Sequence, residues 1–177
     1  MDLKKYIRSI PDYPKLGIMY RDITTLLGNN KALKYSGEKI ADKFSGYNIS
    51  KIVVVESRGF LLGSIVAYLL NTGIALVRKK GKLPFETYSA NYNLEYGSDS
   101  IEIHKDSILP GEKVLLHDDL LATGGTISAT SELINKCGGD IVGASFLIEL
   151  SFLHGRELMN SIGINNIFSL IDFKNED

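Results

Sequence analysis

The sequence predicts an α/β protein whose mainly parallel β-sheet is flanked by helices. Two wholly apolar runs, Ile52–Val55 and Val114–Leu116, have the composition of strands that are covered on both faces. Each run is followed by a helical pattern, and strands that alternate with helices are typical of a parallel sheet with right-handed crossovers. Only Leu94–Ile103 alternates between apolar and polar residues, which predicts an antiparallel hairpin there.

Each element has a local signature in the sequence. Pro11 is expected to close a first short helix, Pro14 and Gly17 place Asp12–Ile18 in a loop, and Gly138 ends the last long helix. The predicted helices are Leu3–Ile10, Lys31–Phe44, Phe60–Leu70 and Thr126–Lys136. The predicted strands are Ile52–Val55, Ile74–Val77, Val114–Leu116, Ile141–Leu150 and Ile167–Ile171.

The composition is that of a globular protein. The chain has 177 residues, of which 44% are hydrophobic and 23% charged, so we expect one domain, residues 1–177, with a full core. A formal net charge of -1 argues against a general nucleic-acid binder, and no apolar stretch approaches the length of a membrane span. A single cysteine, Cys137, and an amphipathic start without a signal core indicate a cytoplasmic protein.

The segment Lys79–Lys105 is too long for an ordinary connection between two strands. It is rich in Tyr, Ser, Asn, Gly and charged residues, a composition that is common in loops that close over a site. We therefore expect a lid at about residues 85–105.

The stretch HDDLLATGGT, residues 117–126, carries the clearest chemical signal. A buried strand leads into two carboxylates and a Thr-Gly-Gly-Thr turn, and a helix follows at once. The backbone N–H groups at a helix start favour an anion, Thr123 and Thr126 add hydroxyl donors, and Gly124 and Gly125 let the backbone approach closely. The natural ligand of such a turn is a phosphate.

Asp118 and Asp119 would repel that phosphate. They are therefore expected to face another part of the same ligand, either sugar hydroxyls or a hydrated Mg²⁺ ion. The structural alternative is that Asp119 only caps the helix and the glycines only form a turn; the complete motif favours function. His117, just before the acids, is expected to be a partly buried, hydrogen-bonded residue without a catalytic role.

Five further stretches accompany this motif in a fixed order. Together they read IPDYPKLGIMYRDITTLL (10–27), ESRGFLLG (56–63), VRKKGKLP (77–84), LEYGSDSIEIHKD (94–106), DDLLATGGT (118–126) and GREL (155–158). In this order and spacing they resemble the type I phosphoribosyltransferase family, and within it the members that act on adenine. The resemblance implies a Rossmann-like core, a small hood formed by about residues 1–30, a flexible lid hairpin and a homodimer.

The resemblance also implies a reaction of purine salvage: adenine and 5-phosphoribosyl 1-diphosphate give AMP and diphosphate, with Mg²⁺ as cofactor. It assigns binding of 5-phosphoribosyl diphosphate to Asp118, Asp119, Ala122, Thr123, Gly124, Gly125 and Thr126, and assigns water-mediated contact with Mg²⁺ to Asp118 and Asp119. It assigns the pyrophosphate part to Glu56, Ser57, Arg58, Gly59, Arg78, Lys79 and Lys82. For the basic residues of this set, the alternative is a solvated loop.

For adenine, the resemblance points to Met19, Tyr20, Arg21, Arg58 and Leu150, with Tyr20 stacked on the base. For catalysis it points to Glu95, Arg58 and Tyr96. Glu95 would handle a proton at the N7 side of the purine, and Tyr96 would help to exclude water. The alternatives are an ordinary buried aromatic at Tyr20 and a solvated hairpin acid at Glu95.

Two other functions are considered besides transfer to adenine. The first is transfer to another purine; Ala122 argues against it, because relatives that act on 6-oxopurines carry an acid at this position. The second is a non-enzymatic sensor of sugar phosphates, against which the chain shows no room for a DNA-binding domain and keeps Glu95 and the basic residues.

Overall fold

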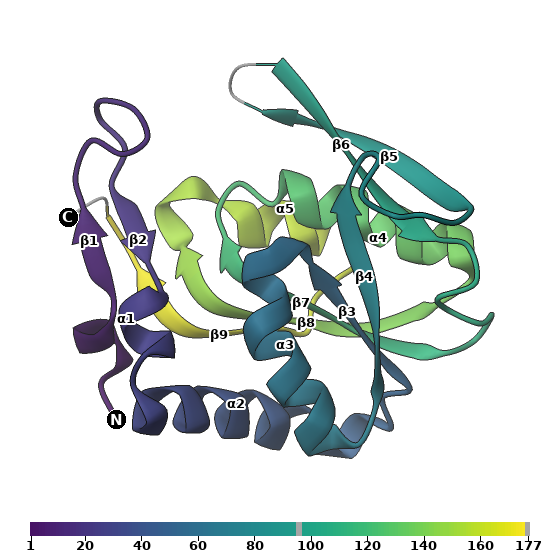
Figure 1. Cartoon of the computed structure of the whole chain (residues 1–177), viewed down its shortest axis with the longest axis horizontal. Helices are drawn as coiled ribbons and strands as arrows, with labels where there is room; N and C mark the ends of the chain where they lie inside the picture. The colour runs from purple at the N-terminus through teal and green to yellow at the C-terminus, as the bar shows by residue number, and fades with distance from the viewer. Residues whose placement is uncertain (95–96, 176–177) are drawn as a thin grey trace.

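The computed structural model describes residues 1–94 and 97–175 and confirms the predicted α/β architecture (Figure 1). A seven-stranded sheet has the order β5-β6-β4-β3-β7-β8-β9. The strands are β3 (Lys51–Val55), β4 (Gly73–Lys79), β5 (Thr87–Leu94), β6 (Gly97–His104), β7 (Lys113–Leu121), β8 (Asp140–Leu150) and β9 (Ile167–Phe173). β4, β3, β7, β8 and β9 are parallel, whereas β5 and β6 pair antiparallel. The parallel strands therefore end at one edge, where open α/β sheets bind their ligands.

Helices cover both faces of the sheet. α2 (Asn30–Phe44) and α3 (Glu56–Leu70) lie on one face, and α4 (Gly125–Cys137) and α5 (Gly155–Ser161) lie on the other (Figure 1). β3 serves both layers, because Ile52 and Val54 belong to the core under α2 and α3 while Val53 and Val55 belong to the core under α4. Among the described residues, none of the helices is long and apolar enough to cross a bilayer.

The N-terminal segment differs from its prediction. The expected helix over Leu3–Ile10 is wrong: a 3₁₀ turn, η1 (Leu3–Tyr6), is followed by the strand β1 (Arg8–Ile10). β1 pairs antiparallel with β2 (Tyr20–Asp22) in a separate two-stranded sheet, beside which the short helix α1 (Thr24–Leu27) begins. Pairing of β1 with a strand further along the chain overrides the local helical pattern. A side-chain contact adds to this pairing, since Arg8 Nε donates to Asp22 Oδ2 at 3.0 Å.

Two boundaries near the predicted site also differ. β7 does not end at Leu116 but continues to Leu121, so both aspartates lie on the strand. α3 begins at Glu56, so the expected turn 56–59 is the first turn of this helix. Glu56 has a positive φ of 46°, a strained conformation for a residue with a side chain.

The predicted antiparallel hairpin is confirmed. β5 and β6 pair from Thr87 with His104 to Leu94 with Gly97, and the hairpin extends beyond the sheet at the top of Figure 1. Lys136 of α4 supports it by donating from Nζ to the Ser89 carbonyl at 3.0 Å.

Candidate active site

The phosphate-type turn joins the end of β7 to the start of α4. Gly124 caps α4 with a φ of 84°, which a residue with a side chain rarely adopts, and no side chain caps this helix start. A cavity of about 210 Å³ opens at the turn. Its lining contains Arg58, Asp118, Asp119, Leu120, Ala122, Thr123, Gly124, Gly125, Thr126 and Ile127. All seven residues predicted for 5-phosphoribosyl diphosphate thus line a single cavity.

The two aspartates are part of the lining of this cavity. Asp119 is buried with 6% exposure, and its backbone N–H donates to Asp118 Oδ1 at 2.8 Å. Burial, together with the neighbouring charge of Asp119, raises the pKa of Asp118 well above its usual value. Burial also raises the pKa of Asp119, although the guanidinium of Arg58 opposes that shift. The acids are therefore held in a site where negative charge is disfavoured until a cation or a hydrogen-bond donor arrives.

Arg58, in the first turn of α3, links this cavity to the N-terminal sheet. Its Nη2 lies 2.5 Å from Asp119 Oδ2 and 3.4 Å from the Arg21 carbonyl. Its Nη1 donates to the Tyr20 hydroxyl at 3.0 Å, and the guanidinium carbon lies 5.2 Å from the Tyr20 ring centre. Gly59 follows in the same turn and lies next to Asp118. Arg58 thus contacts the predicted adenine segment and the predicted ribose acids at once.

His117 is hydrogen-bonded, as the sequence predicts, but it is fully buried where only partial burial was expected. It has no exposed surface, and its Nδ1 lies 2.9 Å from Ser145 Oγ. Burial lowers the pKa of His117 to about 4, so the imidazole is neutral at neutral pH. His117 lies on β7 with its ring next to Gly63 of α3 and outside the cavity lining, which agrees with a structural role.

The other residues predicted for pyrophosphate form a second group beside the cavity. Glu56 accepts hydrogen bonds from Arg78 Nε at 3.2 Å and from the Lys79 backbone N–H at 2.7 Å. Lys79 Nζ lies 2.8 Å from Asp99 of β6, which raises the pKa of Lys79. Lys82 is exposed in the turn after β4. The structure therefore brings Arg58 to the cavity, while neither Ser57 nor these four residues belong to its lining.

A second cavity, of about 340 Å³, lies on the side of the predicted adenine residues. Its lining contains Leu16, Gly17, Ile18, Met19, Arg21, Leu150, Phe152 and Leu153. The cavity brings together three of the predicted residues, Met19, Arg21 and Leu150. Tyr20 is not part of the lining; it packs edge-on against Tyr13, with ring centres 5.1 Å apart.

The sequence reasoning missed the apolar wall of this second cavity. Phe152 and Leu153 lie in a 3₁₀ turn, η3 (Ser151–Leu153), directly after β8. One residue of the cavity could have been recognised in the sequence: Leu16 is apolar although it lies in a loop between Pro14 and Gly17. In the structure Leu16 is 89% exposed. Arg21 is fixed below this wall, since Nη1 donates to Ser9 Oγ at 2.5 Å and the guanidinium carbon lies 4.0 Å from the Phe173 ring centre.

Glu95 and Tyr96, the catalytic residues expected in the lid, lie outside the described residues. The described part of the hairpin contains Tyr92, whose hydroxyl donates to Asp99 Oδ2 at 3.4 Å. Asp99 thus contacts both Tyr92 and Lys79 and connects the hairpin to the end of β4.

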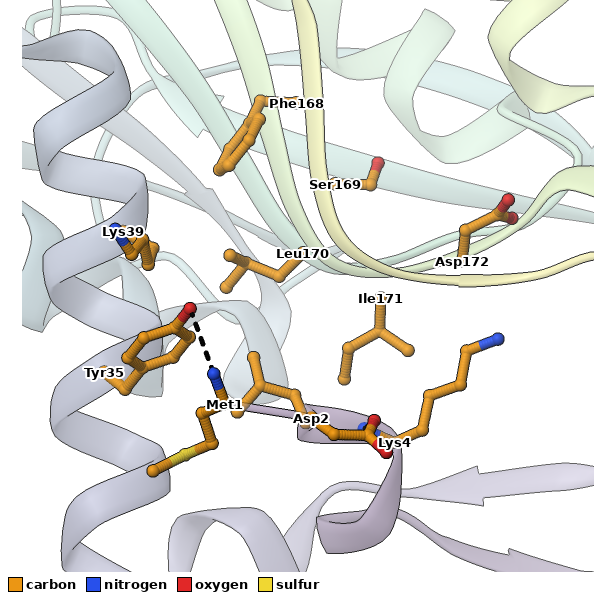
Figure 2. Close-up of a pocket in the computed structure, with 11 residues that line it drawn as sticks. Met1, Asp2, Lys4, Tyr35, Lys39, Phe168, Ser169, Leu170, Ile171 and Asp172 are labelled. Carbon is orange, nitrogen blue, oxygen red and sulfur yellow. Dashed lines mark hydrogen bonds between the residues drawn. The ribbon is translucent and has the colours of Figure 1, made fainter.

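A third hollow, of about 360 Å³, lies between the N-terminal residues and β9 (Figure 2). Figure 2 shows the Met1 ammonium donating to the Tyr35 hydroxyl, at 3.5 Å, on its α2 side. None of its lining residues belongs to the predicted site. Within residues 1–94 and 97–175, no three His, Cys, Asp or Glu side chains form a metal site.

Comparison with known proteins identifies the family. A family model described as phosphoribosyl transferase domain matches residues 22–174. The adenine phosphoribosyltransferase of Sodalis glossinidius is 54% identical over 171 residues, which cover 97% of this chain and 93% of the relative. The chain belongs to the adenine phosphoribosyltransferase family.

Solved structures of this family agree with the fold. The adenine phosphoribosyltransferase of Thermoanaerobacter pseudethanolicus superposes with a TM-score of 0.93 at 49% identity, covering 97% of this chain and 98% of that one. The APRTase of Giardia lamblia, solved in complex with 9-deazaadenine, superposes with a TM-score of 0.93 at 36% identity, covering 98% of this chain and 97% of that one. The enzyme therefore has the type I phosphoribosyltransferase fold and acts as an adenine phosphoribosyltransferase in purine salvage.

Proposed function

We propose that the two cavities at the carboxyl edge of the sheet are the places where this enzyme binds 5-phosphoribosyl diphosphate and adenine. The observation that carries the proposal is the shared lining of the first cavity by two acids and the phosphate-type turn. The 5′-phosphate binds the turn from Ala122 to Thr126, where backbone N–H groups at the start of α4 and two threonine hydroxyls act as donors. Asp118 and Asp119 accept hydrogen bonds from the ribose 2′ and 3′ hydroxyls.

The same pair of acids suits a hydrated Mg²⁺ ion. Mg²⁺ keeps several of its waters and needs only one or two carboxylates besides substrate phosphates. Asp118 is half-buried at the cavity, and burial disfavours its charge, so a cation there would relieve the electrostatic cost of ionising the pair. Asp118 and Asp119 would hold the ion through its waters, and the ion would neutralise charge on the diphosphate.

The diphosphate leaves toward the start of α3 and the end of β4. Arg58 is already at the cavity, and Glu56 holds Arg78 and the Lys79 backbone beside it. Ser57 and Gly59 lie in the same helix start, whose N–H groups favour an anion. Lys82 completes this basic set on the neighbouring turn. Positive charge fixed in advance near a leaving anion lowers the barrier to its departure.

Adenine binds in the second cavity, between the Leu16–Met19 loop and the Leu150–Leu153 wall. The apolar lining suits a flat, neutral base, and the backbone of Met19 and Arg21 offers hydrogen-bonding groups at its edge. The 9-deazaadenine bound by the Giardia lamblia enzyme supports an adenine-shaped ligand in this fold. Tyr20 contributes by placing Arg58 between the base and the ribose.

The chemistry needs the ribose carbon C1 to be attacked by purine N9 as the diphosphate leaves. The developing positive charge on the ribose lies near Asp118 and Asp119, which stabilise it electrostatically. Arg58 stabilises the negative charge that develops on the leaving diphosphate. Glu95 is proposed to share the purine proton at N7, and Tyr96 to exclude water when the hairpin closes.

The proton-handling role of Glu95 predicts a turnover defect. Glu95→Gln keeps the size of the side chain and removes its basicity, so kcat should fall about 10²–10⁴-fold while the adenine KM changes little. Steady-state kinetics at saturating substrates measures this effect. Unchanged turnover would remove Glu95 from the mechanism.

The assay that tests the function supplies 5-phosphoribosyl diphosphate, Mg²⁺ and one of four bases: adenine, hypoxanthine, guanine or xanthine. Product formation with adenine, dependent on Mg²⁺ and absent after chelation, supports the proposal. Equal or better turnover with a 6-oxopurine would overturn the specificity. The same preparation tests the proposed homodimer, since its solution mass should be twice the chain mass of 19.5 kDa.

A further inference from the structure

The stretch Gly155–Leu158 belongs to the sequence resemblance but has no role in the site proposed above. It opens α5, directly after the η3 turn that lines the adenine cavity. α5 packs on α4, the helix whose start carries the phosphate-binding turn. The stretch therefore lies between the two substrate cavities.

Gly155 touches the back of the phosphate-binding turn. A Cβ atom built on Gly155 would overlap the carbonyl oxygen of Ala122 and lie 3.0 Å from Leu121 Cδ1. The contact is reciprocal, because a Cβ atom on Gly124 would lie 3.0 Å from the Gly155 carbonyl oxygen. Two backbones thus pack directly on each other, with a glycine on each side.

Arg156 fixes this contact to the sheet. Its Nε and Nη2 donate to the two oxygens of Glu149, at 2.8 and 2.5 Å, and its Nη1 donates to the Ile167 carbonyl at 3.2 Å. Glu149 is only 4% exposed, and a paired, two-point contact of this kind is geometrically specific. The start of α5 is therefore tied to both β8 and β9.

We propose that Gly155 is a positioning residue for the phosphate-binding turn, supported from behind by Arg156. The proposal rests on the proposed function of that turn. Ala122 and Gly124 line the cavity and also contact Gly155, so any displacement at Gly155 moves the groups that hold the 5′-phosphate. The φ of Gly155 is not positive, so its requirement is for space and not for backbone freedom.

The experiment compares Gly155→Ala with the matched variant Gly143→Ala. Gly143 lies in β8, where an added Cβ atom would come within 2.8 Å of Asn166 and Phe44, away from both cavities. Gly155→Ala should raise the KM for 5-phosphoribosyl diphosphate about 10–100-fold, with a much smaller change in the adenine KM. Gly143→Ala should lower the melting temperature but change both KM values by about threefold or less.

A second variant covers the case in which Gly155→Ala does not fold. Arg156→Lys keeps the positive charge beside Glu149 but loses the two-point geometry, so the KM for 5-phosphoribosyl diphosphate should again rise more than the adenine KM. Calorimetric titration with ribose 5-phosphate measures binding at the turn and the neighbouring acids without the diphosphate and adenine contacts, and this affinity should fall in parallel. If the foldable variants bind ribose 5-phosphate as the wild type does, the proposal is overturned. A wild type that binds ribose 5-phosphate but makes no AMP would instead refute the proposed function.

Discussion

At the scale of single residues, the site contains two carboxylates whose ionised form is unfavourable while no ligand is bound. Asp118 and Asp119 share one cavity, and burial raises the pKa of both. Arg58 relieves part of this cost by pairing with Asp119 at 2.5 Å. Binding strength at such a site is obtained at the expense of the stability of the empty protein.

Replacing both acids should therefore increase the stability of the empty protein and weaken its binding of 5-phosphoribosyl diphosphate. A raised carboxyl pKa in the folded state means that the unfolded chain ionises first, so stability falls as pH rises from the ordinary aspartate pKa toward the raised one. Asp118→Asn with Asp119→Asn removes this loss, and at pH 7 the melting temperature should rise by about 2–4 °C. Affinity for 5-phosphoribosyl diphosphate should fall by about 10–100-fold, because charged hydrogen bonds are lost.

Calorimetric titration and thermal melts of the same preparation check both expectations. Intact affinity in the double variant would contradict the assignment of the acids to ribose and Mg²⁺.

Tyr20 allows the ring and the hydroxyl to be tested separately. Tyr20→Phe removes only the hydrogen bond from Arg58, so the adenine KM should rise by about tenfold, the lower end expected for one hydrogen bond to a charged group. Tyr20→Ala also removes the ring beneath Arg58 and should raise the adenine KM more than the KM for 5-phosphoribosyl diphosphate. Equal effects of the two variants in steady-state kinetics would argue against a role for the ring.

At the scale of elements, the β5–β6 hairpin competes for a residue assigned to pyrophosphate. Lys79 Nζ pairs with Asp99 of β6, although Lys79 is proposed to bind the diphosphate. Both side chains are partly exposed, at 57% and 27%, so the pair is worth about 0.2–1 kcal/mol. Binding of diphosphate by Lys79 has to overcome that small cost.

Asp99→Asn should consequently strengthen diphosphate binding by about one and a half to fivefold, the factor that corresponds to this pair. Competitive inhibition by diphosphate measures the change. Glu86→Gln is the matched control, because Glu86 pairs with Lys105 at 3.0 Å on the same hairpin, outside both cavity linings. A weaker inhibition in Asp99→Asn would show that Asp99 places Lys79 for binding instead of competing for it.

The elements also show what the sequence could and could not predict. The parallel core followed from local patterns, because strands buried on both faces are apolar throughout. The N-terminal helix was wrong, since the pairing of β1 with β2 depends on residues that lie far apart in the chain. The end of β7 was missed because two acids interrupt its apolar run, although Leu120 and Leu121 pair with β8.

The first cavity could be predicted because all of its lining residues except Arg58 lie between Asp118 and Ile127, whereas the second could not be predicted completely. Its wall joins a loop after Pro14 to a turn after β8, and only the folded chain brings them together. Apolar residues such as Phe152 also look like ordinary core residues in a sequence. Gly155 stands in the GREL stretch of the resemblance, but its proposed role could not be predicted, because it depends on a contact with Ala122 that only the folded chain makes.

At the scale of the whole molecule, His117 makes stability depend on pH. Its pKa is about 4 in the folded state, below the ordinary value of 6.5, because burial disfavours the charged ring. The unfolded chain therefore takes up the proton first. Stability from this group is complete above pH 6.5 and is lost as the pH falls toward 4, by on the order of 3 kcal/mol.

His117→Gln should flatten this part of the stability curve, because the side chain can still meet Ser145 but no longer titrates. Urea unfolding between pH 7 and pH 4 gives the slopes. His154→Gln is the control, since the His154 side chain is 68% exposed and its removal should leave the slope almost unchanged. Identical slopes in the wild type and His117→Gln would show that other groups govern acid unfolding.

β3 divides its four apolar residues between two separate cores, two for each layer. A residue inserted into or deleted from this strand would move each later side chain of the strand from one core to the other, since side chains alternate with a period of two. The strand can thus tolerate a change of side-chain size far better than a change in residue count. Length, more than composition, is the property of β3 that natural variation should leave untouched.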